Sequence, residues 1–184
     1  MRVMGFDPSL SNFGMSKGNI VDGIWIPDTV GLITTAKGKN LKQVRKSSDD
    51  LRRCGELIGG LSDFVKDVDV VFVEVPHGSQ SASAAYSKGV SHMAIATIQV
   101  PVIQCTAEEV KVAATGQKTA SKKDMIDWAF GLYPDLDWLR ARGKSDGDLT
   151  NANEHIADSM GAVHAGMNTP EFALAMRFSM EKAA

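Results

Sequence analysis

The chain has 184 residues, of which 43% are hydrophobic and 23% charged, and its formal net charge is −2. These values are typical of one globular domain spanning 1–184, and they exclude a membrane-spanning protein because no apolar run is long enough. The near-zero net charge also argues against a uniformly basic nucleic-acid binder. Cys54 and Cys105 lie in apolar patterns, so we expect buried free thiols, as in a cytoplasmic protein without a signal peptide.

The first 35 residues predict three antiparallel strands. The apolar segment 2–7 ends at Pro8, which cannot donate to a sheet ladder, so the first strand should stop at Asp7. Segments 12–21 and 24–35 follow, joined by the tight-turn pair Asp22-Gly23.

Helices and strands alternate in the remaining chain. A helix is expected over about 49–68, with Ser47 or Ser48 as its cap, and the apolar run 70–76 predicts a strand buried on both faces. The segments that follow are predicted as a helix over 81–97, a strand over 100–104, helices opened by capping boxes at Thr106 and Ser121, a loop over 134–150, a helix over 153–167 and a final helix from Thr169. The fold class is therefore α/β, with a five-stranded mixed sheet flanked by helices.

Isolated acids at two strand ends and on one helix suggest a site. Asp7 follows a buried strand, although it could simply form a turn with Pro8. Glu74 interrupts an apolar run, where an unpaired carboxylate is costly, so it indicates a structural ion pair, a metal or catalysis. His155 and Asp158 share one side of a helix, a pattern that is also common on solvated surfaces. Oxygen ligands favour Mg²⁺ or Mn²⁺, and two such ions can support phosphodiester hydrolysis.

Four blocks resemble, in the expected order, the RuvC family of Holliday junction resolvases within the ribonuclease H-like superfamily. They are 5–14 with its Gly-x-Asp-Pro opening, 71–74 with a strand-end glutamate, 110–122 with lysines, and 155–162 with histidine, two residues and then aspartate. The resemblance implies a ribonuclease H-like fold and a metal-dependent homodimer that makes paired symmetric cuts in four-way DNA junctions. It also implies that two Mg²⁺ or Mn²⁺ ions are held by Asp7, Glu74, His155 and Asp158, with Lys111 and Lys122 near the scissile phosphate.

The chain departs from the family pattern in two loops. Family members often carry an aromatic wedge after the glutamate, whereas here the segment 77–81 holds none and the nearest aromatic residue is Tyr86. The loop 134–150 is also longer than in the cellular enzymes. These departures indicate a divergent branch, such as a phage-encoded one acting in its host's cytoplasm, and they leave the junction selectivity open.

Two basic runs are candidate DNA contacts. The run 111–123 holds four lysines and no acid, and we expect Lys111, Lys118, Lys122, Lys123, Ser79 and Gln80 to contact DNA. The run 37–53 holds seven cations against Asp49 and Asp50, and is either a DNA contact or a solvated face. Small residues over 81–89 suit either close packing on the sheet or a dimer contact.

Three other functions stay open from the sequence alone. One is a broader branch or flap endonuclease that uses the same site. Another is a nucleotide-binding protein of the actin-like superfamily, which shares this strand order and would use the residues after Asp7 as a phosphate loop. The last is a junction-binding protein without catalysis.

Overall fold

The computed structural model describes residues 1–39, 42–75, 78, 81–141 and 147–183. Its centre is a five-stranded sheet of order β3-β2-β1-β4-β5. The first three strands are antiparallel neighbours, and β4 and β5 run parallel to β1, as predicted. Their bounds are β1 Arg2–Asp7, β2 Asn12–Val21, β3 Ile24–Thr34, β4 Val70–Val75 and β5 Val102–Thr106.

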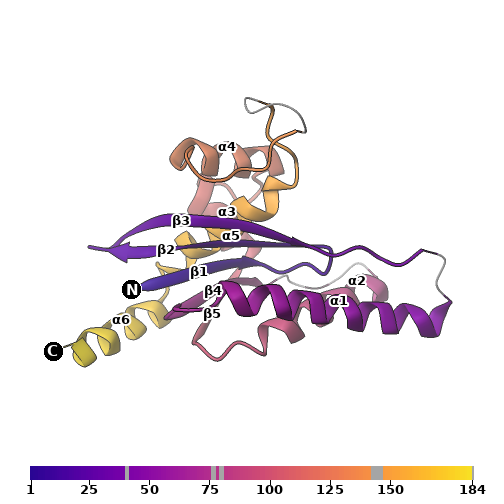
Figure 1. The fold of residues 1–184 in the computed structure, drawn as a ribbon. Coiled ribbons are helices and arrows are strands. Elements are labelled where there is room, and N and C mark those ends of the chain that lie inside the picture. Colours follow the sequence, from indigo (N-terminus) through magenta and orange to yellow (C-terminus); the bar gives the residue numbers. More distant parts are fainter. Residues whose placement is uncertain (40–41, 76–77, 79–80, 142–146, 184) are drawn as a thin grey trace.

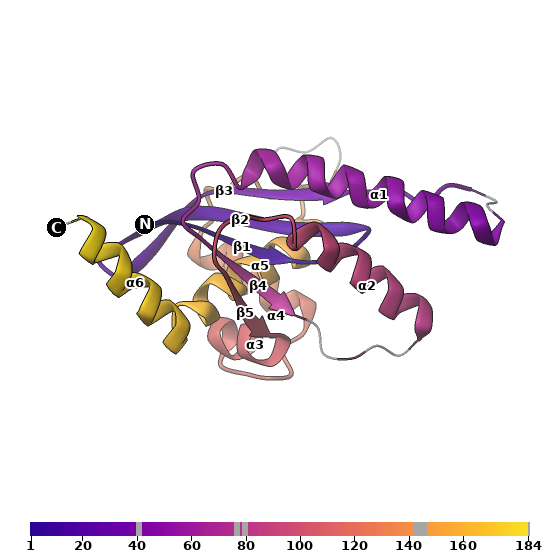
Figure 2. The same cartoon turned by 90° about the horizontal axis from the view of Figure 1, so that it is seen from below.

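Helices cover both faces of this sheet (Figure 1). Helices α1 (Gln43–Phe64) and α2 (Ala82–Ile95) pack against each other on one face, as Figure 2 shows from below. The opposite face carries α3 (Ala107–Thr115), α4 (Lys122–Leu132) and α5 (Asn153–Gly166), with α6 (Pro170–Ala183) following. The predicted α/β fold class is thus confirmed. None of the described helices is both long and apolar enough to cross a membrane.

The alternation of side chains along the strands divides the core into two clusters. Val3, Val70 and Phe72 belong to the cluster under α3, α4 and α5, whereas Met4 and Val71 belong to the cluster under α1 and α2. Successive strand residues point to opposite faces, so both faces of the central strands are buried. The two free thiols also divide this way, because Cys54 is in one cluster and Cys105 in the other.

The predicted bounds of α1 were wrong at both ends. The helix begins after Lys42, which provides no side-chain cap, so Ser47 and Ser48 lie inside it rather than before it. It ends at Phe64, and Asp67 just beyond adopts a left-handed backbone (φ 61°). Lys17 Nζ, from β2, donates to the carbonyls of Phe64 (2.8 Å) and Lys66 (2.7 Å), so a distant lysine satisfies backbone groups at this end, which no local pattern reveals.

Both predicted capping boxes are present. The hydroxyl oxygens of Thr106 and Ser121 each accept a hydrogen bond from the backbone N–H three residues later. The carboxylates of those later residues, Glu109 and Asp124, accept hydrogen bonds from the backbone N–H groups of Thr106 and Ser121. The described parts of the predicted loop 134–150, residues 134–141 and 147–150, contain no helix or strand and carry one bridge, Arg140 to Leu149.

Candidate active site

Two adjacent strands place Asp7 and Glu74 at the same edge of the sheet. Strands β1 and β4 are parallel, and Phe6 pairs with Val73, so Asp7 and Glu74 each lie one residue beyond that pair. Val3 and Phe72 point toward α5, and the two acids are an even number of residues from them, so they point the same way. The carboxyl ends of parallel strands are where open α/β sheets usually carry their sites.

Helix α5 brings His155 and Asp158 over these strand ends. His155 Nδ1 lies 2.6 Å from Asp7 Oδ2, which joins residues 148 positions apart. Asn153, fully buried, fixes the start of this helix by exchanging hydrogen bonds with the backbone of Leu139 (2.9 and 2.8 Å). The segment before α5 therefore sets the position of the histidine.

Two glycines allow α5 to lie this close to the strands. A Cβ atom at Gly14 would be 1.9 Å from the backbone oxygen of His155, and one at Gly5 would be 1.9 Å from that of Ser159. No real Cβ atom fits at that separation, so the helix backbone occupies space that only glycine leaves free. The contact of His155 with Asp7 depends on this close packing.

The electrostatics of the site favour a bound cation. Burial, followed by the charge of Asp7, raises the pKa of Glu74 to about 7, although Lys111 and Lys88 oppose the shift. Burial, together with the charges of Asp7 and Glu74, raises the pKa of Asp158 to about 8. Each carboxylate therefore destabilises the ionised form of its neighbours, as expected where like charges converge without a counterion. Burial lowers the pKa of His155, but the hydrogen bond to Asp7 and the charges of Asp7, Glu154 and Asp158 together outweigh burial and raise it.

The donor set fits a hard divalent cation. Three carboxylates and one imidazole are available, and Glu154 adds a buried oxygen, Oε2, that has no hydrogen-bond partner among the described residues. In the part of the chain that the structure describes, no three His, Cys, Asp or Glu side chains are arranged so that they could hold a metal ion without rearrangement. His155 Nδ1 and Asp7 Oδ2 bond each other, which leaves His155 Nε2 and Asp7 Oδ1 as the atoms of this pair that an ion could use without breaking that bond.

Three lysines lie around this acidic group. Lys111 on α3 and Lys88 on α2 are close enough to Glu74 to act on its pKa. Lys122, the first residue of α4, donates to Glu154 Oε1 at 2.6 Å, and the same oxygen lies 3.5 Å from His155 Nε2. The structure thus brings Lys111 and Lys122 toward the predicted ligands, and their place near a scissile phosphate stays a prediction.

The other predicted DNA contacts are placed differently. Lys118 pairs with Glu108 (2.9 Å) and Lys123 pairs with Asp127, so both cations are already neutralised on the surface. Ser79 and Gln80 lie outside the described residues. DNA contacts by these four residues therefore stay predictions.

The basic run 37–53 divides into exposed and internal cations. Exposed side chains are found at Lys37, Lys39, Lys42 and Arg45. Arg52 pairs with Asp49 (2.7 Å) and with Glu56, and Arg53 is 0% exposed. A DNA contact through Arg53 is therefore ruled out, because no part of its side chain reaches the surface.

Two site residues were missed by the sequence reasoning. Lys88 carried no signal beyond its charge, because only the folded structure brings α2 beside the end of β4. Glu154 directly precedes His155, but neighbours in a helix do not normally share a face. Its role becomes visible only through Lys122, which reaches it from 32 residues away.

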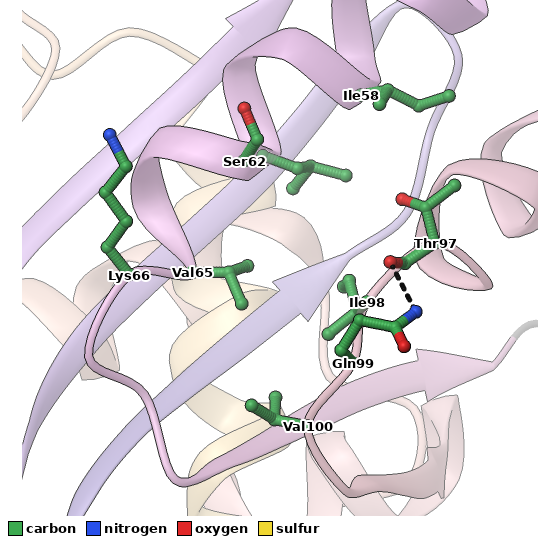
Figure 3. Close-up of a pocket in the computed structure, with 9 residues that line it drawn as sticks. Ile58, Ser62, Val65, Lys66, Thr97, Ile98, Gln99 and Val100 are labelled. Carbon is green, nitrogen blue, oxygen red and sulfur yellow. Dashed lines mark hydrogen bonds between the residues drawn. The ribbon is translucent and has the colours of Figure 1, made fainter.

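One hollow in the described part of the chain lies away from these acids. It measures about 340 Å³ and lies between the end of α1 and the segment 97–100 before β5 (Figure 3). Lys66 is the one charged residue among those lining it. Because it lies before β4 and β5 begin, it is at the opposite end of the sheet from Asp7 and Glu74.

Comparisons with known proteins agree with this geometry. The crossover junction endodeoxyribonuclease RuvC of Corynebacterium efficiens is 32% identical over 129 residues, 68% of this chain. RuvC of Prochlorococcus marinus AS9601 is 28% identical over 69% of the chain. The chain spans about half (55%) of the first relative's length and 78% of the second's. No family model matches the chain.

The fold is that of solved RuvC structures. Thermus thermophilus RuvC in complex with a Holliday junction substrate superposes with a TM-score of 0.64, over 96% of both chains, at 18% identity. The predicted ribonuclease H-like sheet is thus confirmed, and so is the predicted resemblance to the RuvC family.

Proposed function

Because the chain is similar in sequence to RuvC endonucleases and has their fold, we propose that it is a metal-dependent endonuclease that resolves four-way DNA junctions. The observation that carries the proposal is the placement of Asp7, Glu74, His155 and Asp158. They come from two strands and one helix and meet at one edge of the sheet, where their charges act on one another. The same relatives support a single nuclease domain over 1–184.

In this proposal, Asp7, Glu74, His155 and Asp158 hold two Mg²⁺ or Mn²⁺ ions. Such ions, when bound, activate water and stabilise the leaving oxygen of a phosphodiester. Holding such ions would require the ionised carboxylates of Glu74 and Asp158, and the ring nitrogen of His155 that does not bond Asp7 would be available as a further ligand. Lys111 and Lys88 contribute positive charge beside Glu74, where the phosphate backbone would lie.

Lys122 has a second role in the proposal. Its ammonium is held by Glu154 in the DNA-free protein, beside the proposed ligand His155. A DNA phosphate is negatively charged like Glu154, so it can replace Glu154 as the ion-pair partner of Lys122 when the strand enters the site. The exposed cations of 37–45 extend the basic surface along the DNA, as expected for backbone contacts that position the substrate.

The proposal includes a homodimer, because paired symmetric cuts in a two-fold substrate require two related sites. Helix α2 carries two exposed large apolar side chains, Tyr86 (51%) and Met93 (60%), seven residues apart and therefore on one side of the helix. The small residues predicted to permit close approach, Ala82, Ala85 and Gly89, are exposed on the same helix. We place the dimer contact there.

The structure gives the nucleotide-binding alternative no support. A phosphate loop needs free backbone amides after Asp7. Here Ser9 Oγ accepts the amides of Ser11 (3.3 Å) and Asn12 (3.4 Å), so these donors are already used.

The test is a cleavage assay on a labelled four-way junction, a Y-fork and a linear duplex, each with Mg²⁺, Mn²⁺ or a chelator. The proposal predicts paired cuts in the four-way junction that require the metal, from a protein whose mass in solution is about twice 19.7 kDa. Equal cleavage of the fork would support the broader branched-DNA nuclease instead. Junction binding without cleavage in either metal would contradict both nuclease proposals.

A further inference from the structure

The largest side chain with no exposed surface is Arg53 of helix α1. An arginine is almost never fully buried unless its charge and its N–H donors are all engaged, because desolvation is costly. One partner is local: Nη1 donates to Asp50 Oδ1 at 3.1 Å, one helical turn earlier.

Its other hydrogen bonds leave the helix and converge on the segment that follows Asp7. Arg53 Nη2 donates to the carbonyl of Leu10 (3.1 Å) and to Ser11 Oγ (2.8 Å). Only residues 8–11 separate Asp7, the last residue of β1, from the start of β2. The guanidinium therefore holds the middle of a four-residue connection that begins at a proposed metal ligand.

A buried threonine completes this network. Arg53 Nε donates to Thr35 Oγ1 at 2.8 Å, and Thr35 Oγ1 in turn donates to the carbonyl of Leu10. The amide of Thr35 also donates to the carbonyl of Ser11 at 3.0 Å. Leu10 is thus held by two donors from two different elements, and the loop has little freedom to move.

We propose that Arg53 is a positioning residue for the active site: its buried guanidinium, with Thr35, fixes the 8–11 loop and so the carboxylate of Asp7. The inference rests on the proposed function, because it takes Asp7 to be a metal ligand. Partners outside the first coordination sphere typically affect metal affinity by 10–100-fold, which is the effect expected here. Arg53 itself touches neither the ion nor the DNA.

The test compares two variants that weaken the network with two controls. Arg53→Lys keeps the charge but loses the planar fork, and Thr35→Val keeps the volume but loses the hydroxyl. Thr35→Ser keeps the hydroxyl. Thr29→Val makes the same substitution in the middle of β3, where the hydroxyl bonds only Asp28 among the described residues. Mn²⁺ affinity is measured without DNA by electron paramagnetic resonance, alongside single-turnover junction cleavage, junction affinity and circular dichroism.

Arg53→Lys and Thr35→Val are expected to weaken Mn²⁺ binding by about tenfold or more and to slow cleavage at limiting metal, with unchanged junction affinity. Thr35→Ser and Thr29→Val should match the parent protein. Folded Arg53→Lys and Thr35→Val proteins with parental Mn²⁺ affinity would overturn the inference, as would a Thr35→Ser protein as impaired as Thr35→Val. If Arg53→Lys does not fold, the Thr35 pair decides. A parent protein that neither binds Mn²⁺ nor cuts junctions would instead overturn the proposed function.

Discussion

At the scale of single residues, the ionised forms of Glu74 and Asp158 are unfavourable when no cation is bound. Glu74 and Asp158 have pKa values of about 7 and 8, well above those of ordinary carboxyl groups. An acid whose pKa is raised by folding contributes stability at low pH and loses it as the pH rises from its ordinary pKa to its folded one. The metal-free protein should therefore lose stability between about pH 4 and pH 8, and Mg²⁺ should restore it.

The variant Asp158→Asn tests this balance. Removing the buried charge should stabilise the metal-free protein at pH 9 by at least about 1 kcal/mol, since one unit of pKa shift is worth about that much. The corresponding rise in Tm is about 2–4 °C, measured by thermal unfolding in a chelator. The gap should be smaller at pH 5, where the folded parent protein is largely protonated at this position. A variant less stable than the parent at pH 9 would contradict the burial of a repelled charge.

The sequence pattern identified the acids of the site but not the buried arginine that holds the loop after Asp7. Asp7 and Glu74 were visible because a carboxylate at the end of an apolar strand is costly and so requires an explanation. Arg53 was not, because it lies in a basic run whose other members are exposed. Only the folded chain shows that this one cation points inward, toward a loop 42 residues away.

At the scale of elements, the site depends on how closely α5 packs on β1 and β2. The backbone oxygens of His155 and Ser159 lie where side chains at Gly14 and Gly5 would place their Cβ atoms, so the helix can approach the strands only because these two residues are glycines. The sequence pattern predicted the strands and this helix, yet it contained no measure of their separation.

The substitution Gly14→Ala should therefore disrupt the site. Its Cβ atom would overlap the backbone of His155, so α5 must move away from Asp7. We expect a loss of about 1–3 kcal/mol in stability, as for overpacked cores, and cleavage slowed by about 100-fold, measured by denaturant unfolding and junction assays. Gly131→Ala on α4 is the matched control, since its Cβ atom meets nothing within 4 Å. That variant should be slightly more stable, because alanine favours helix. Parental activity in Gly14→Ala would contradict the close-packing argument.

At the scale of the whole molecule, the order of the elements was predictable and their connections were less so. Tight turns and short apolar runs predict the five strands, because a central strand that buries both faces is apolar along its length. The bounds of α1 were not predictable, because its start has no side-chain cap and the carbonyl of its last residue, Phe64, is bound by Lys17 from a distant strand.

The net charge of −2 also has a different meaning in the folded molecule. Several of the acids that produce it gather at one edge of the sheet, and the cations of 37–45 stay exposed. We expect a polarised surface of this kind to bind DNA despite a pI near 6.1, with an affinity that depends on the metal and falls with salt.

The central proposal is that these acids form a metal site that cuts junctions. The most direct measurement is a gel assay of the parent protein and Asp7→Asn on one labelled four-way junction, scored for binding in Ca²⁺ and for cleavage in Mg²⁺. Asp7→Asn keeps the shape of the side chain and removes the charge. We predict that both proteins bind the junction and that only the parent cuts it. Cleavage by Asp7→Asn at the parental rate would contradict the account.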